Sequence, residues 1–224
     1  MATRTRRSER RQEPLSRERI VAAAVEILDT VDEGGLTFRA LAERLSTGPG
    51  AIYWHVTGKA ELLAAATDAV VTTAISADDA DATPQDAIRA LALGVFDAFD
   101  AHPWVGANLA RTPSPSPSPK LRIFERIGRQ VQALGVPEAT LFTAASTLLN
   151  YILGVAGQNA ANTRKARPGA NRTEFLDATA AAWEELDPGR YAFTRDVAGQ
   201  LREHDDREEF LAGIDLILGG ITAG

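Results

Sequence analysis

Three side chains that can both stack and donate hydrogen bonds follow one another in the chain: Tyr53, Trp54 and His55. A tyrosine hydroxyl and a histidine ring N–H can donate to phosphate oxygens, and an indole offers an apolar plate to a thymine methyl as well as a donor. The preceding residues, 46–50, are rich in glycine and proline and predict a turn. This combination indicates contact with a nucleic acid.

Two short helices must position these side chains. The first is predicted to begin at Thr37, whose hydroxyl suits a helix cap, and the second covers residues 51–56. Within the second helix, Ile52 and Val56 are one turn apart and should pack inward, so that residues 53–55 project outward. Two helices joined by a tight turn are typical of helix-turn-helix DNA-binding proteins, whose second helix enters the major groove.

Other residues around the turn complete a predicted DNA-binding set. Arg39, early in the first of these helices, is the candidate for a bidentate contact with guanine. Gly50 and Ala51 are small enough to let the backbone approach base edges or phosphates closely. Lys59, beside the start of a further helix, should contact a phosphate.

The charge distribution favours the same end of the chain. Residues 1–59 contain 10 Arg and Lys against 8 Asp and Glu, a balance of +2, whereas the remaining 165 residues contain 14 against 22, a balance of −8. The first 19 residues alone hold seven arginines and three glutamates, a balance of +4. Such a basic arm attracts phosphates. The alternative is a solvated tail that only aids solubility.

Composition excludes several classes of protein. The chain has 224 residues and no cysteine, which excludes disulfides and cysteine-based zinc sites and suits the cytoplasm. Its beginning has no apolar stretch of the secretory type. Residues 139–163 carry no charge and are long enough to cross a bilayer, but they include Asn150, Gln158, Asn159 and Asn162. Because amides are costly against lipid, we expect a buried helix instead.

Helical periodicity runs through almost the whole chain, which predicts an all-α fold. Ser16 should cap a first helix with Ile20, Ala24, Ile27, Leu28 and Val31 on its apolar side. Thr83 and Pro84 should open another helix. Residues 112–119 alternate with proline and predict a loop, as does the stretch 164–172. Further helices are expected at about 104–111, 120–134, 138–164, 173–186, 192–203 and 206–221, the last with Asp206 and Glu209 as a capping box.

Residues 16–72 resemble the DNA-binding domain of the tetracycline-repressor (TetR) family of bacterial regulators. The resemblance is carried by AAAVEILDTVDEGGLTFRALAERL, by AIYWHVTGKAELL and, at the end of the chain, by EEFLAGIDLILGGI. It implies an all-helical homodimer that binds a palindromic operator in double-stranded DNA and is released by a small molecule. The positions that match the family's DNA contacts are Thr37, Arg39, Ala51, Tyr53, Trp54, His55 and Lys59. Gly50 and Ala51 stand where larger residues are usual, so the resemblance does not give the operator sequence.

These inferences divide the chain into three parts. Residues 1–15 form a basic, disordered arm, residues 16–60 the DNA-binding domain, and residues 61–224 a helical domain for ligand binding and dimerisation. Two apolar helices, 138–164 and 206–221, should form a four-helix bundle with their symmetry mates. That bundle would bury Leu149, Ile152, Leu153, Leu211, Ile214, Leu218 and Ile221, with Gly154, Gly157, Gly213 and Gly219 allowing close approach. An internal core of a monomer is the alternative.

The central helices could also enclose a ligand. The candidates are apolar walls and polar groups that are costly to bury without a partner: Phe96, Phe99, Trp104, Asn108, Asn150, Tyr151 and Gln158. Each of them could instead be an ordinary satisfied core residue. The segment NLARTP is similar to the family loop in which a histidine helps to hold drug-chelated magnesium, but Asn108 stands in that place. We therefore expect another partly apolar ligand, and no metal or cofactor.

Parts of the sequence suggest two other functions. The cluster His204, Asp205, Asp206, Glu208 and Glu209 could suggest catalysis, but its spacing is not a metal motif, and acidic residues at a helix start suit the helix dipole. The chain has no phosphate-binding glycine loop, nucleophile elbow or zinc signature, so we expect no enzyme. The second alternative is a DNA-binding activator or architectural protein without a small-molecule ligand.

Overall fold

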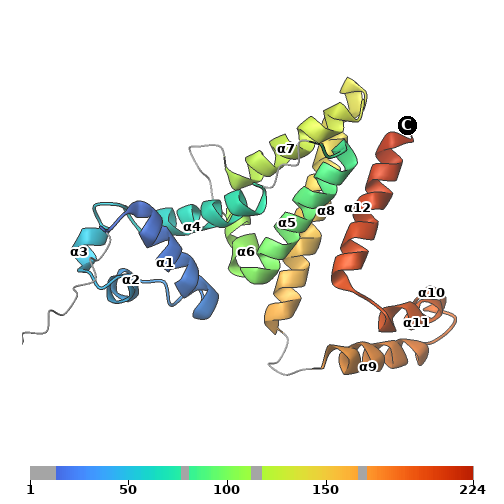
Figure 1. Cartoon of the computed structure of the whole chain (residues 1–224). Helices are drawn as coiled ribbons and strands as arrows, with labels where there is room; N and C mark the ends of the chain where they lie inside the picture. The colour runs from blue at the N-terminus through green and yellow to red at the C-terminus, as the bar shows by residue number, and fades with distance from the viewer. Residues whose placement is uncertain (1–13, 77–80, 112–117, 166–170, 224) are drawn as a thin grey trace, which may run out of the picture. The chain divides into compact units, whose positions relative to one another are not determined.

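The computed structural model describes residues 14–76, 81–111, 118–165 and 171–223, which are helical apart from connecting turns (Figure 1). Within these ranges there is no strand, which confirms the predicted all-α class. The helices are α1 (Arg17–Thr30), α2 (Phe38–Arg44), α3 (Pro49–Ile52), α4 (Lys59–Ala74), α5 (Pro84–Ala101), α6 (Trp104–Arg111), α7 (Pro119–Ala133), α8 (Glu138–Lys165), α9 (Arg172–Glu184), α10 (Ala192–Asp196), α11 (Ala198–Arg202) and α12 (Asp206–Thr222).

The chain divides into two units, with the boundary between Ala66 and Thr67, inside α4. The sequence placed this boundary between residues 60 and 61, so the unit that contains the helix-turn-helix includes six more residues. The predicted basic arm lies almost wholly in residues 1–13, outside the described part of the chain.

In the first unit, α1 begins as predicted, because the Ser16 hydroxyl accepts a hydrogen bond from the Arg19 backbone N–H at 3.3 Å. Ile20, Ala24, Ile27 and Leu28 are buried along one side of the helix. Val31 was expected to continue this side but is exposed. The reason is that α1 ends at Thr30, and Val31 has left the helical backbone geometry.

The helix-turn-helix itself differs in detail from the expectation. Thr37 caps α2 by accepting from the Ala40 N–H at 3.1 Å, as predicted. However, α3 covers residues 49–52 instead of 51–56. Pro49 opens it, because a ring-fixed φ suits the first helical position. Ile52 and Val56 are buried, as expected, and Tyr53 to His55 form the turn that follows α3.

In the second unit, α5, α7 and α12 pack against the long helix α8, and α6 also contacts it (Figure 1). By length and composition alone, Glu138–Thr163 in α8 could cross a membrane, but a core helix passes the same test. Here Leu148, Leu149 and Ile152 of α8 are buried against the helices around it. Packing within the chain therefore accounts for the apolar side chains on this side of α8, whereas Phe142 of the same helix is exposed.

Two helix starts and one predicted helix in this unit depart from the predictions. Ser118 caps α7 and Pro119 is its first residue, although 119 was expected to lie in the loop; the rest of that loop, 112–117, lies outside the described residues. At α12 the capping residue is Asp205, not Asp206, because the Asp205 carboxylate accepts from the N–H groups of Arg207 and Glu208. The segment expected as one helix at 192–203 is two short ones, α10 and α11.

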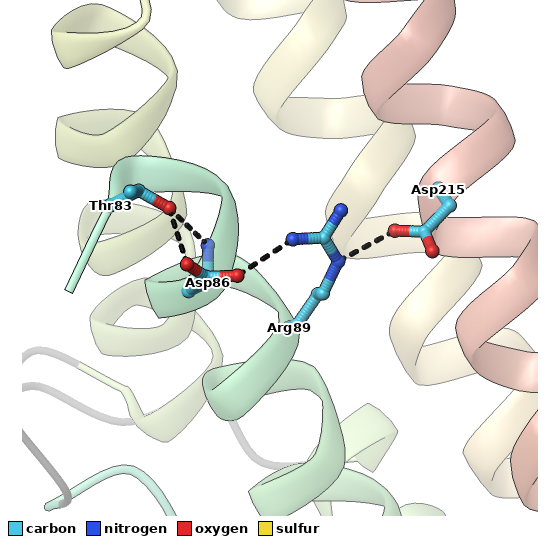
Figure 2. A network of polar contacts seen from close by, with 4 residues as sticks. All are labelled: Thr83, Asp86, Arg89 and Asp215. Atoms are coloured by element: carbon cyan, nitrogen blue, oxygen red, sulfur yellow. Dashed lines mark hydrogen bonds and ion pairs between the residues drawn. The ribbon is translucent and has the colours of Figure 1, made fainter.

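Polar side chains connect α5 to α12 near the start of α5 (Figure 2). Arg89 donates through Nη1 to Asp86 at 2.8 Å and through Nε to Asp215 of α12 at 2.7 Å. Thr83, the cap of α5, donates to the other Asp86 oxygen at 2.7 Å. The Thr83 and Arg89 hydrogen bonds lower the pKa of Asp86, and Asp215 raises the pKa of Arg89. Because Thr83, Asp86 and Asp215 are exposed and Arg89 is only half-buried, these contacts orient the helices more than they stabilise them.

The residues expected at a dimer interface are mostly in the core of the single chain. Leu149, Ile152, Ile214 and Leu218 are buried, and Leu153, Leu211 and Ile221 are half-buried. Within the chain α8 and α12 pack on each other and on α5, which accounts for the four buried residues, and a four-helix bundle with a symmetry mate stays a prediction. The face of α12 that remains open is one of small and apolar side chains around Leu216, which is 79% exposed: Ala212, Gly219 and Gly220.

Candidate DNA-binding surface and ligand cavity

The turn after α3 places two aromatic side chains on the surface. Trp54 is 90% exposed and Tyr53 is 58% exposed. The Tyr53 ring lies flat against Phe38 at the start of α2, with 4.3 Å between ring centroids and planes only 1° apart. Phe38 therefore fixes the orientation of the Tyr53 ring. The Tyr53 hydroxyl can then serve as a positioned hydrogen-bond donor. No aromatic partner stacks on Trp54 among the described residues, so its indole is open to a partner outside the chain.

Cationic side chains surround this turn in the sequence and belong to the same unit. Arg39 of α2 is largely exposed, and its Nε donates to Glu43 one helical turn later at 3.0 Å. An exposed pair of this kind contributes little stability, so the guanidinium can exchange Glu43 for another acceptor at small cost. The Lys59 ammonium donates to the Glu33 carbonyl at 2.5 Å, which holds it at the start of α4.

The small residues before the turn leave space. A Cβ atom added to Gly50 would meet nothing within 4 Å, so the backbone at the start of α3 faces open space. Ala51 and His55 are half-buried, and the Ala51 N–H donates to the Gly48 carbonyl at 3.0 Å. All eight predicted DNA-binding residues lie in the first unit, on or beside α2, α3 and the start of α4. Their contact with DNA stays a prediction.

Glu61 organises this region, and sequence reasoning missed it. One oxygen of its carboxylate accepts from the Thr57 N–H at 2.7 Å and the Thr57 hydroxyl at 2.8 Å, and the other accepts from Arg17 of α1 at 3.1 Å. The Thr57 hydrogen bonds, and then Arg17, lower the pKa of Glu61. Glu61 thus attaches the start of α4 to α1. The available signal was a threonine shortly before a glutamate at a helix start, although the spacing of four is one residue longer than in a capping box.

The second unit contains a cavity of about 260 Å³ bounded by α5, α8 and the start of α12. Its lining consists of aromatic, amide and acidic side chains with one valine and one histidine: Phe96, Tyr151, Val155, Gln158, Asn159, Asn162, His204, Asp206, Glu209 and Phe210. The size approaches that of pockets for small molecules. Three of the seven predicted ligand residues, Phe96, Tyr151 and Gln158, line it.

The other four predicted ligand residues lie elsewhere. Phe99 and Trp104 are buried in the core, and Asn150 is exposed on α8. Asn108 is buried and donates to the Trp104 carbonyl at 3.0 Å, which provides a structural reason for its polar group. None of the four lines the described cavity, and a role for them in ligand binding stays a prediction.

Three rings form the apolar wall of the cavity. Phe210 of α12 lies between Phe96 of α5, at 4.8 Å, and Tyr151 of α8, at 5.7 Å between ring centroids. The Tyr151 hydroxyl donates to the Phe210 carbonyl at 3.3 Å. Gly213 makes this contact feasible, since a Cβ there would lie 1.8 Å from the tyrosine oxygen. The wall is therefore a continuous stack across three helices.

The polar rim is acidic. Asp206 is paired with Arg172 at 2.8 Å and with His204 at 2.9 Å. Glu209 forms no ion pair with another residue that the structure describes, and its charge adds to burial in raising the pKa of Tyr151. Across the described residues, no group of three or more side chains is arranged to hold a metal ion. The cavity can thus surround an apolar body and present one uncompensated carboxylate.

Comparison with known proteins covers nearly the whole chain. The family model for bacterial regulatory proteins of the tetR family matches residues 20–66, and the model for the tetracyclin repressor-like C-terminal domain matches residues 77–224. The chain is 30% identical over 224 residues to the transcriptional repressor DrrR1 of Streptomyces coeruleorubidus, which covers 96% of the chain and 81% of that protein. A match of 31% to a regulator of Saccharopolyspora erythraea covers 62% of this chain and 59% of that one.

Solved structures show the same relationship. A TetR transcriptional regulator of Streptomyces coelicolor is 66% identical, with a TM-score of 0.86 over 94% of this chain and 99% of that one. The regulator BioQ, solved with its double-stranded DNA operator, is 27% identical, with a TM-score of 0.61 over 94% of this chain and 100% of that one. The helix-turn-helix unit and the larger helical unit therefore occur together in these relatives.

Proposed function

The chain belongs to the TetR family of bacterial transcriptional regulators, and from this premise we propose that it is a ligand-responsive repressor. In this proposal a homodimer binds a palindromic operator in the cytoplasm, and a small molecule bound in the second unit releases it. The observation that carries the proposal is the exposed, oriented aromatic pair after α3, Tyr53 and Trp54, with Arg39 beside it in the same unit.

An exposed tryptophan supports a binding role on physical grounds. Removing a large apolar side chain from water is favourable, so a fully exposed indole is left uncompensated unless a partner covers it. In a major groove the indole can pack against a thymine methyl, while Arg39 can bind guanine bidentately. BioQ, a relative of the same fold, binds a double-stranded operator, which supports DNA as the partner here.

A homodimer is supported by the open face of α12 around Leu216, which we call the α12 face and define as Ala212, Leu216, Gly219 and Gly220. Small residues allow two helices to approach closely, and a second copy would cover Leu216. A two-fold dimer would also place two reading helices in successive turns of the same DNA groove.

A route from ligand to DNA is supported by the contacts of α4 within the second unit. Arg122 of α7 donates to Asp68 at 2.5 Å and to Thr72 at 2.9 Å, both on α4. On the α5 side, a Cβ at Gly94 would lie 2.2 Å from the Ala74 carbonyl oxygen, so these helices touch backbone to backbone. A ligand that moves α5 must therefore displace the end of α4. Release requires different affinities for two dimer shapes, typically about 1–3 kcal/mol of coupling.

Selection of operators from a random double-stranded DNA library by the full-length protein tests the proposal. We expect enrichment of one palindromic sequence and two chains per site in sedimentation equilibrium. Affinity should fall by about 10³-fold or more between about 50 and about 200 mM salt, because several phosphates are neutralised. The proposal that the protein recognises a DNA sequence would be overturned if no sequence is enriched, or if the affinity for DNA does not change with salt concentration.

The α12 face has its own test. Leu216→Asp should convert the dimer to a monomer in sedimentation velocity, because it places a charge in the centre of the interface. Phe193→Asp, at another exposed apolar position outside α12, is the matched control and should leave the dimer intact. A dimer that survives Leu216→Asp would exclude this face.

The response to a ligand is tested on the operator complex. If no small molecule, retained from the cell or added, weakens that complex, the alternative of a regulator without a ligand is favoured.

A further inference from the structure

The charges around the cavity indicate which chemical class of ligand it can bind. Among the lining residues that the structure describes there is no lysine and no arginine, while two carboxylates, Asp206 and Glu209, face the cavity from the first turn of α12. The two carboxylates are not equivalent. Asp206 already has Arg172 and His204 as partners, so its charge is largely compensated. Glu209 has no described ion-pair partner and provides the net negative charge of the cavity.

Helix capping does not account for Glu209. Acidic residues are common at helix starts because they complement the helix dipole. In α12, however, Asp205 is the capping residue and accepts from the N–H groups of Arg207 and Glu208. Glu208, next to Glu209, serves the helix dipole equally well and does not line the cavity. What separates the two glutamates is that only Glu209 borders the space beside Tyr151 and Phe210.

The α8 part of the cavity lining provides neutral hydrogen-bonding groups. Gln158 and Asn162 of α8 line it, and their side-chain amides make no hydrogen bond to another described residue. Amide oxygens accept hydrogen bonds from an ammonium group, and a carboxylate adds charge to such a contact. The rings of Phe96, Phe210 and Tyr151 form the apolar wall of the same cavity, and their π faces also favour a cation.

From this arrangement we infer that the effector is an organic cation, a small aromatic or otherwise apolar body that carries a protonated amine. The apolar body lies against the three stacked rings, and the ammonium group pairs with Glu209 and the α8 amides. An anionic molecule of the same shape meets Glu209 as a like charge, and no basic residue among the described lining residues offsets it. This inference rests on the proposed function, since it specifies the ligand of the same cavity.

Three probes of one shape test the charge preference: 2-(1-naphthyl)ethylamine, 1-naphthaleneacetamide and 1-naphthaleneacetate. Equilibrium dialysis against the full-length protein without DNA gives each dissociation constant. We expect the amine to bind about tenfold more tightly than the acetate, with the amide between them, because one exposed charge attracts the first and repels the last. Higher salt should narrow the difference.

Glu209→Gln and Glu208→Gln form the matched pair of variants. Glu209→Gln should reduce the preference for amine over acetate to about threefold or less, whereas Glu208→Gln should leave it unchanged. The inference is overturned if the acetate binds as tightly as the amine, if no probe binds, or if the two variants behave alike. Because DNA is absent from this measurement, operator selection remains a separate test: either can fail while the other succeeds.

Discussion

Two tryptophans illustrate how differently the two units of this chain are built. Trp54, in the first unit, is 90% exposed after α3, whereas Trp104, in the second, is 4% exposed at the start of α6. In the first unit the candidate functional residues are neighbours in the sequence, 53–55, and lie on the surface. In the second, the three rings of the cavity wall come from positions 96, 151 and 210.

This difference has a physical origin. DNA is a large partner outside the chain, so a reading surface needs exposed side chains on a short, stable turn, and local structure is sufficient to present them. A small ligand must be surrounded, and surrounding it requires several helices to meet. The first unit should therefore lose function through side-chain deletions that leave its fold intact, and the second through changes in packing.

The largest effect is expected in the reading surface. Trp54→Ala combined with Arg39→Ala should weaken binding to the selected operator by about 10²-fold or more, since each base contact contributes about 1–3 kcal/mol. Circular dichroism should remain unchanged, because both side chains are exposed. Fluorescence anisotropy with labelled operator measures the affinity.

The matched controls for this pair are in the second unit. Phe193→Ala removes another exposed aromatic ring, and Arg129→Ala removes another exposed arginine paired one helical turn away, with Glu125. Both should leave operator affinity within about twofold, because neither belongs to the reading surface. Equal losses in the controls and in the Trp54 and Arg39 double variant would contradict the division between the units.

A packing change should dominate in the second unit. Gly213→Ala places a Cβ 1.8 Å from the Tyr151 oxygen and should lower the free energy of unfolding by about 1–3 kcal/mol through overpacking. Gly128→Ala in α7 meets nothing within 4 Å and should be neutral or stabilising by up to about 1 kcal/mol. Urea denaturation followed by circular dichroism compares the two; a smaller loss for Gly213→Ala than for Gly128→Ala would refute the close contact.

A smaller effect is expected where α7 holds α4. Arg122→Met keeps the aliphatic stem but removes the hydrogen bonds to Asp68 and Thr72, and should cost about 1 kcal/mol of unfolding free energy. A double-mutant cycle with Asp68→Asn isolates the pair. If the two substitutions are additive, the pair contributes nothing, and the proposed route from the ligand to DNA loses the support of this contact.

The smallest effect concerns acid stability in the first unit. Hydrogen bonds from Thr57, and then Arg17, lower the pKa of Glu61, so the stability they provide is present above the ordinary glutamate pKa and is lost as pH falls through the lower, folded value. Glu61→Gln should therefore flatten the decline of unfolding free energy with acidification below about pH 4.5, and Thr57→Ala should flatten it in part. Parallel pH profiles for the natural protein and Glu61→Gln would show that Glu61 does not contribute.

Local signals were sufficient for much of the first unit. Ser16 and Thr37 cap helices as expected because capping involves only residues two or three positions apart. The limits of the reading helix were predicted less well. The glycine and proline stretch appeared to be all turn, but Pro49 is compatible with a helix start as well as with a turn, and periodicity over four residues cannot distinguish the two.

In the second unit, the sequence determined that α8 and α12 are apolar helices whose side chains must be buried against other residues. The periodicity of its apolar residues also determined the helical class. Only the tertiary structure decided what covers them: Ile152 and Ile214 are buried within the chain, while Leu216, on the same helix as Ile214, is exposed. The hydrophobic effect favours removing an apolar side chain from water, but it does not specify which residues cover that side chain, because it is non-directional. The partner depends on how α5, α8 and α12 meet, and so do the cavity and the distinct position of Glu209.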